Sequence, residues 1–263
     1  MTNIVKSIIY EVIRSRLLIF LFLIMAGVNV LVTVLNIAEN TFKEATTSAM
    51  LSEAHNTVFM FAEFFVVAAV GIICGSDFKD KVANYEILNG HSRIKIYLAR
   101  SISAVFIASI LGAAISFVPL VSGNIFFDFG SRLELGDVII RTALLFFPYL
   151  RLAAFAVILT FVIKNQYAVM GISYGIIMFN TLMSGIVTNH DNLLTANFNL
   201  NLLADYEGWT VYNISKAEGI VNYAAYDSSL PMWAVTGTIF VSLAVMLVYL
   251  VIGYGLFRRD ELN

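Results

Sequence analysis

The chain has 263 residues, of which 59% are hydrophobic and only 13% are charged. This composition carries more apolar surface than a soluble core of that size buries, which predicts an integral membrane protein solvated by the lipid bilayer. The formal net charge of -2 argues against a nucleic-acid partner, and the single cysteine, Cys74, excludes a disulfide within the chain.

The first 16 residues carry apolar side chains at helical spacing. These residues are Ile4, Val5, Ile8, Ile9, Val12 and Ile13. The pattern predicts an amphipathic helix over 1–16 that lies in the membrane interface on the cytoplasmic side. The alternative interpretation is a cytoplasmic extension of the first membrane span. The apolar run that follows is too long for a signal peptide, so we expect it to remain in the mature protein.

Six apolar runs are long enough, or nearly long enough, to cross a bilayer as helices. They cover residues 17–37, 58–74, 101–121, 138–163, 167–187 and 233–257. Because the runs are continuously apolar and do not alternate, they predict an all-α protein with six transmembrane helices rather than a barrel. We treat residues 1–263 as a single transmembrane domain.

The distribution of Lys and Arg predicts which ends of the helices face the cytoplasm. Eleven of the 16 basic residues fall on one side: Lys6, Arg14, Arg16, Lys79, Lys81, Arg93, Lys95, Arg100, Lys164, Arg258 and Arg259. Only Lys43, Arg132 and Lys216 fall on the other side. Short basic loops stay in the cytoplasm, so we expect a multi-pass protein with both termini cytoplasmic.

The largest cytoplasmic segment lies between the second and third spans, from residue 75 to residue 100. We expect a helix over 76–89, started by a cap at Ser76 or Asp77 and stopped by Gly90. Its apolar stripe consists of Phe78, Val82, Tyr85 and Leu88. Such a helix suits docking into a groove of a soluble protein, and the alternative is a solvated loop on the lipid headgroups.

This segment, with acidic and basic residues, a short helix, a Gly stop and then Ser92-Arg93, resembles that of ABC-2 type transporter permeases. The terminal Phe257-Arg258-Arg259-Asp260 also resembles their ending, and the likeness in layout covers the whole chain. It is closest to the small permeases of bacitracin, lantibiotic-immunity and cytolytic-peptide exporters. The resemblance implies a type V exporter-like fold in a bacterial cytoplasmic membrane, with an interface helix, six spans and a coupling helix.

The same resemblance implies the partners. The coupling helix would contact a separate ATPase subunit through Asp77, Phe78, Asp80, Val82, Tyr85, Glu86, Leu88 and Arg93. No GxxxxGK[ST] phosphate loop occurs in the chain, so ATP and Mg are expected to bind the ATPase, and this chain is expected to bind no cofactor itself. A second permease chain, identical or related, would complete the transporter.

Three charged residues lie within the predicted spans, where an unpaired charge costs at least about 2.5–3.5 kcal/mol. Arg141 and Arg151 belong to the fourth span, about 15 Å apart along a straight helix, with Pro148 between them as a source of bending. Glu63 of the second span matches Arg141 in depth, so we expect those two to pair. The three residues either line the translocation path or make structural contacts between helices.

Residues 188–232 form a polar outer segment, and the resemblance implies short helices there that dip back into the membrane. Trp209 and Trp233 suit the headgroup level. His190 and Asp191 are too few ligands for a zinc site, so no metal is expected.

Three function classes remain to be weighed. The residues and the resemblance together favour an export permease for a peptide, antibiotic or other amphipathic compound. The alternative is a non-transporting sensor or immunity protein that binds a toxin or regulates a partner complex. An intramembrane enzyme is not expected, because the spans contain no paired carboxylates, HExxH motif or GxSxG motif.

Overall fold

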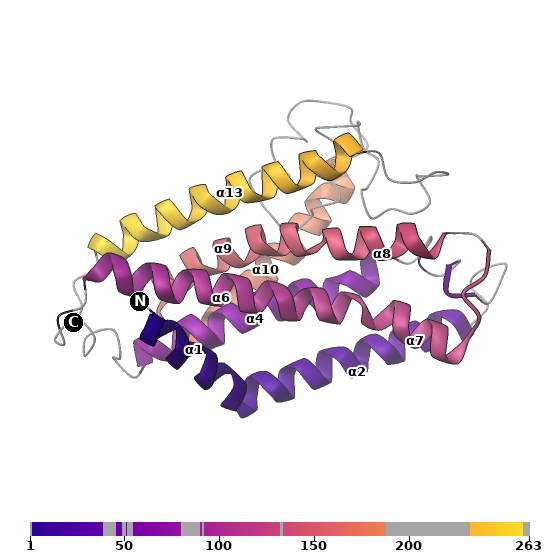
Figure 1. Ribbon diagram of the computed structural model, residues 1–263, viewed down its shortest axis with the longest axis horizontal. Helices are drawn as coiled ribbons and strands as arrows, with labels where there is room; N and C mark the ends of the chain where they lie inside the picture. The colour runs from indigo at the N-terminus through magenta and orange to yellow at the C-terminus, as the bar shows by residue number, and fades with distance from the viewer. Residues whose placement is uncertain are drawn as a thin grey trace.

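The protein is described here by a computed structural model that covers residues 2–38, 46–48, 51, 55–79, 90, 92–131, 134–187 and 232–259. All regular structure in these ranges is helical, and they contain no strand (Figure 1). The helices are α1 (Thr2–Arg14), α2 (Arg16–Ala38), α4 (His55–Lys79), α6 (Arg93–Ser116), α7 (Val118–Phe126), α8 (Leu135–Leu144), α9 (Phe146–Ile163), α10 (Gln166–Val187) and α13 (Met232–Arg259).

A helix occupies each of the six predicted apolar runs, although the third and fourth runs are each divided into two helices. Four helical stretches in the described ranges are long and apolar enough to cross a membrane. These are Arg16–Ala38, Arg93–Phe126, Leu135–Ile163 and Val235–Arg258, and a shorter apolar stretch covers Phe61–Gly75. The helices are those of a multi-pass membrane protein. The predicted outer segment at 188–232 lies outside the described residues, apart from Met232 at the start of α13.

The predicted N-terminal amphipathic helix is present as α1, and a single residue lies between it and α2. Ser15 separates the two, and its side-chain oxygen accepts a hydrogen bond from the backbone N–H of Leu18 at 3.4 Å. A serine in this position caps an orphan donor in the first turn of the next helix. Ile4 and Ile8 are buried, and α1 packs against α6. The helix α1 is therefore docked on the bundle.

The third predicted span bends at Phe117, between α6 and α7, because of Pro119. Proline has no N–H to donate to the carbonyl four residues earlier, which is that of Ile115. The side-chain amide of Asn29, on α2, donates a hydrogen bond to this carbonyl at 3.3 Å, and Asn29 is fully buried. A buried asparagine in the first span thus supports the bend in the third.

The second predicted span is longer than expected, because α4 begins three residues earlier and ends five residues later than 58–74. Its buried face packs against α6 and α9. The approach to α6 depends on Gly112, where an added Cβ would lie 2.3 Å from Cγ2 of Val66. Small residues at such positions let membrane helices pack closely.

A Gly112→Ala substitution is expected to lower the free energy of unfolding by about 1–3 kcal/mol, because it overpacks this contact. Combining it with Val66→Ala removes the clashing methyl group and should recover part of the loss. Gly27→Ala is the matched control, since nothing lies within 4 Å of its added Cβ. Equal losses for Gly27→Ala and Gly112→Ala in denaturant titrations of the purified protein would contradict the close-packing account.

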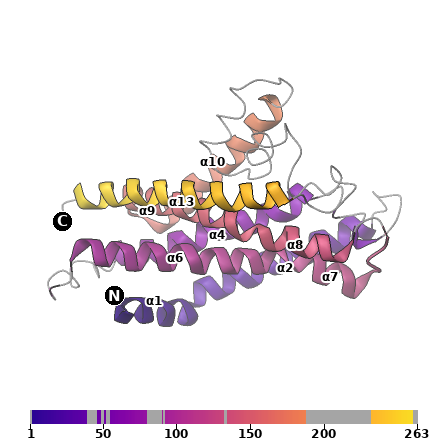
Figure 2. The same ribbon diagram turned by 45° about the horizontal axis from the view of Figure 1, so that its top comes forward.

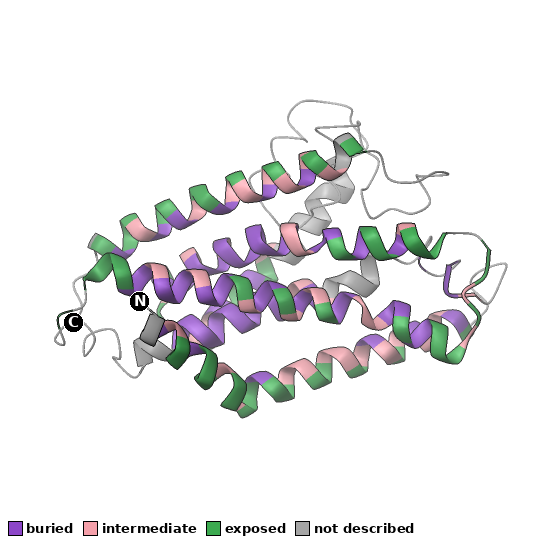
Figure 3. Ribbon diagram, in the orientation of Figure 1, coloured by how far each residue is buried: buried purple, intermediate pink, exposed green. Residues whose placement is uncertain are grey.

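The centre of the bundle is α9, which packs against α4, α6, α10 and α13 and is mostly buried (Figure 3). It ends at Ile163, and the left-handed backbone of the capping residue Lys164 (φ 56°) reverses the chain. Asn165 then starts α10, because its side-chain oxygen accepts hydrogen bonds from the N–H groups of Tyr167 and Ala168. The turned view shows α10 leaving the bundle at a steep angle (Figure 2).

The long stretches α2, α4, α6–α7, α8–α9, α10 and α13 run in alternate directions, and α1 lies at the same end of the bundle as the last turn of α13 (Figures 1 and 2). That end also contains the last turn of α4, the first turn of α6 and the turn between α9 and α10. The described basic residues at this end include Lys79, Arg93, Lys95, Lys164 and Arg258. The opposite end carries Asp128, Glu134 and Asp137. We call these the basic end and the acidic end.

Candidate functional site

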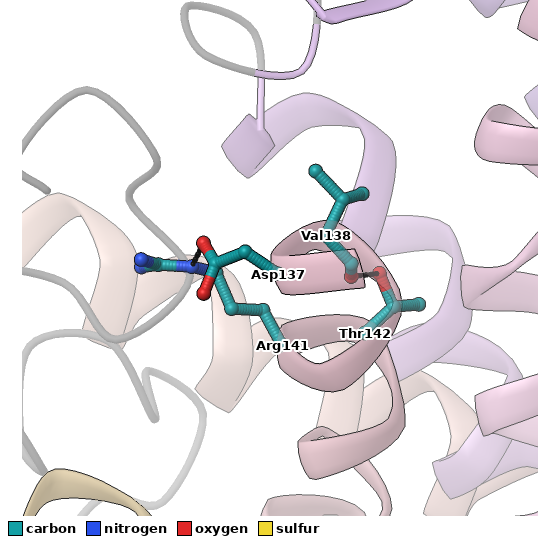
Figure 4. A network of polar contacts seen from close by, with 4 residues as sticks. All are labelled: Asp137, Val138, Arg141 and Thr142. Atoms are coloured by element: carbon teal, nitrogen blue, oxygen red, sulfur yellow. Dashed lines mark hydrogen bonds and ion pairs between the residues drawn. The ribbon is translucent and has the colours of Figure 1, made fainter. Parts of the chain in front are cut away.

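The short helix α8 carries an ion pair at the acidic end of the bundle. Nε of Arg141 donates a hydrogen bond to Oδ2 of Asp137, one helical turn earlier, and both side chains project from the same side of the helix (Figure 4). The Arg141 side chain is fully buried, whereas that of Asp137 is 12% exposed. An acid in the first turn and a base in the last turn also suit the helix dipole.

This pair differs from the contact that we expected between Arg141 and Glu63. The fourth span was predicted to begin at residue 138, which left Asp137 in an outer loop. Glu134 instead adopts an extended conformation at the cap position, and α8 begins at Leu135. Asp137 is therefore inside the helix, four residues before Arg141. Glu63 is half-buried on α4 and has an interaction partner, and its contact with Arg141 stays a prediction.

The other predicted intramembrane arginine, Arg151, is fully buried on α9. It interacts electrostatically with Tyr249 of α13, and the ring of Phe155, one turn further along α9, lies 6.0 Å from the Tyr249 ring. Arg151 has interaction partners in the bundle, as expected for a charge at this depth. Its surroundings place it beside the interface between α9 and α13.

Polar side chains continue along the buried face of α13. Thr238 and Ser242 are fully buried, and they lie one helical turn apart. They are the fully buried polar residues in the described part of α13. We use the name polar seam for Thr238, Ser242, Asp137, Arg141 and Arg151, which lie on the mutually packed helices α8, α9 and α13.

The two arginines lie on two helices, α8 and α9, that a single residue separates. Leu145 separates α8 from α9, and its backbone N–H donates a hydrogen bond to the carbonyl of Thr142 at 3.3 Å. This interruption lies three residues before Pro148, which has no N–H for the carbonyl of Leu144, and the predicted bend there stays a prediction.

The predicted coupling helix is described only at its ends. The cap at Ser76 or Asp77 is wrong, because α4 continues through Asp77 and Phe78 to Lys79 without a break. Asp80, Val82, Tyr85, Glu86 and Leu88 lie outside the described residues. Gly90 has a left-handed backbone (φ 85°), which suits the stop predicted there.

The last predicted coupling residue, Arg93, begins α6 directly after Ser92, which is extended. Its guanidinium donates to the backbone carbonyl of Arg258 at 3.5 Å, near the end of α13. Arg93 thus joins the first turn of α6 to the last turn of α13. Its predicted contact with a partner protein stays a prediction.

One cluster that we did not predict lies one turn further into α6. The ring of Tyr97 is almost fully buried, and its hydroxyl donates to the backbone carbonyl of Leu250 on α13 at 2.7 Å. Its ring centroid lies 5.3 Å from that of Phe161, 5.5 Å from that of Tyr254 and 5.7 Å from that of Phe257. We call these four residues the Tyr97 cluster. They join α6, α9 and α13 at the basic end.

Comparison with known proteins finds no matching family model and no matching curated protein. Within the described ranges, no group of three or more His, Cys, Asp or Glu side chains is arranged to hold a metal ion. The polar seam and the Tyr97 cluster are therefore interpreted from their own geometry.

Proposed function

We propose that the chain is the membrane-spanning permease subunit of an ABC-2 type transporter. In this proposal all six apolar runs cross a bacterial cytoplasmic membrane, and a separate ATPase subunit binds ATP and Mg. The transporter exports a peptide, antibiotic or other amphipathic compound, and a second permease chain completes it. The chain performs no chemical step of its own.

The observation that carries the proposal is the composition of the basic end. Both described chain ends, α1 and the tip of α13, lie at this end, and the segment between α4 and α6 begins and ends there (Figure 1). Short basic segments stay on the cytoplasmic side of a membrane. An ATPase in the cytoplasm would meet this end.

The contacts at the basic end support a mechanical role for the segment between α4 and α6. On one side the segment follows directly from the core helix α4, which continues without a break as far as Lys79. On the other side it enters α6, which Arg93 and Tyr97 tie to α13. A force on this segment would therefore reach helices that also carry the polar seam.

The decisive experiment is affinity purification of the tagged full chain from its own cells in mild detergent. We expect an ATP-hydrolysing subunit with a GxxxxGK[ST] phosphate loop to co-purify in stoichiometric amount. An Asp80→Arg, Tyr85→Asp double variant should lose that subunit, because it reverses one charge and adds another on the predicted docking helix.

An Asp128→Arg variant is the control, since it reverses an exposed charge at the acidic end and should retain the subunit. Elution volume in size-exclusion chromatography shows whether each variant is folded. If the intact native chain brings down no ATPase, the permease proposal fails, and the sensor or immunity function becomes the one to test.

A further inference from the structure

A crevice opens where the chain turns from α1 into α2 and both helices meet α4. Its volume is about 70 Å³, and its apolar walls include Ile8, Leu18 and Ile72, one from each helix. The polar residues that line it are Glu11 and Ser15. The space admits part of a small polar headgroup and the first methylene groups beside it, rather than a complete lipid.

A carboxylate lines this crevice, and a guanidinium lies one turn further along the same helix. Glu11 is the charged residue among the described residues that line it, and its carboxylate interacts electrostatically with Arg100 of α6. Arg14 lies three residues after Glu11, which puts both on one face of α1. The Arg14 guanidinium lies 5.5 Å from the Tyr10 ring centroid and hydrogen-bonds the Tyr10 hydroxyl. These contacts hold Arg14 at the surface.

The outer side of α1 is also apolar, although it faces away from the bundle. Ile9 is 43% exposed and Ile13 is 70% exposed, and Leu17 continues this surface into α2. An amphipathic helix with such a face lies at the boundary between lipid headgroups and acyl chains. The crevice therefore opens at headgroup depth, beside lipid.

We propose that this crevice binds a glycerophospholipid whose headgroup carries a primary ammonium group, as in phosphatidylethanolamine. The ammonium donates hydrogen bonds to Glu11 and Ser15, the phosphate lies beside Arg14, and the adjoining methylene groups contact Ile8 and Leu18. A choline headgroup has no N–H to donate, and a glycerol headgroup has no positive charge to offset that of Glu11. The site does not depend on the permease proposal.

The test measures lipid selectivity of the purified full chain by native mass spectrometry, with dioleoyl phosphatidylethanolamine, phosphatidylcholine and phosphatidylglycerol added in equal amounts. The native chain should retain the ethanolamine lipid about two- to five-fold over the choline lipid, as expected for a partly exposed charge pair. Glu11→Gln should abolish this preference. Arg14→Gln should weaken retention of both lipids while leaving the ratio between them.

Lys6→Gln is the control, because Lys6 is exposed on the same helix but does not line the crevice. The readout is a ratio of two lipids, so a general loss of stability in Glu11→Gln does not imitate the expected result. Equal retention of the ethanolamine and choline lipids by the native chain overturns the proposal. A preference for the glycerol lipid that Arg14→Gln removes and Glu11→Gln does not remove also overturns the proposal, because it indicates binding to an unspecific basic surface.

Discussion

An Asp137→Leu substitution is expected to lower the free energy of unfolding by about 3 kcal/mol, the lower end of the range for breaking a buried ion pair. Arg141 remains fully buried in this variant and loses the carboxylate that accepts its hydrogen bond. The lower end applies because the Asp137 side chain keeps 12% exposure. Denaturant titration of the purified chain in mixed micelles measures the change.

Replacing both partners is expected to be far less harmful than replacing one. An Asp137→Leu, Arg141→Met double variant leaves no buried charge at this position, and apolar residues of similar volume often substitute for such a pair with little loss. We expect its stability to lie within about 1 kcal/mol of the native chain. Glu134→Gln, an exposed change at the start of the same helix, should shift stability by less than about 0.5 kcal/mol.

The double variant also separates the two roles considered for Arg141. In the proposed transporter, a double variant that folds with near-native stability and still supports transport would assign the pair to helix packing alone. If it folds and transport stops, Arg141 contributes to the translocation path. A double variant as unstable as Asp137→Leu alone would contradict the ion-pair account.

Apolar run length was enough to predict where the helices are, because a membrane helix satisfies its backbone hydrogen bonds within itself. The burial of Arg141 and Arg151 was predictable for the same reason, since a charge inside a span must face protein or water. The interruption of the helix before Pro148 fits the chemistry of proline alone. The same rule applied to Pro119 would have predicted the end of α6.

Contacts between distant parts of the chain could not be predicted from the lengths of the apolar runs. The partner of Arg141 depended on where α8 begins, and a shift of three residues moved Asp137 from a loop into the helix. The donation from Asn29 to the Ile115 carbonyl joins two spans with no sequence pattern in common. The cap expected at Ser76 failed because a good capping residue is also compatible with the middle of a continuing helix.

The Tyr97 cluster was missed for a related reason. Phe161, Tyr254 and Phe257 look like ordinary apolar members of two predicted spans, whereas Tyr97 lies in the predicted cytoplasmic segment before the third. Only the fold brings them together. The available signal was position, since Tyr97, Phe161 and Phe257 all lie near the predicted cytoplasmic ends of their helices. That position relates the cluster to the proposed function, because α6 begins directly after the proposed coupling segment.

A Gly253→Ala substitution is expected to lower the free energy of unfolding by about 2 kcal/mol by disturbing this cluster. Gly253 lies three residues after Leu250 on α13, and an added Cβ would lie 2.5 Å from the Tyr97 hydroxyl oxygen. The hydroxyl has little freedom to move, because it donates to the Leu250 carbonyl and its ring is packed among three others. Thermal unfolding in nanodiscs provides a second measure of the loss.

Tyr97→Phe removes the hydroxyl and should by itself cost about 0.6 kcal/mol, the average for hydrogen bonds between membrane helices, and at most about 1.7 kcal/mol. In that background Gly253→Ala should be nearly neutral, because its remaining neighbours, Cζ of Tyr97 and Cγ1 of Ile158, lie at 3.5 and 3.6 Å, which is ordinary contact distance. Gly255→Ala, with nothing within 4 Å, is the control and should be neutral or stabilising. Simple addition of the two single losses would mean that the hydroxyl and the glycine do not meet. The predicted rescue would instead show that α6 and α13 are held together at this point, where a push on the coupling segment would have to pass.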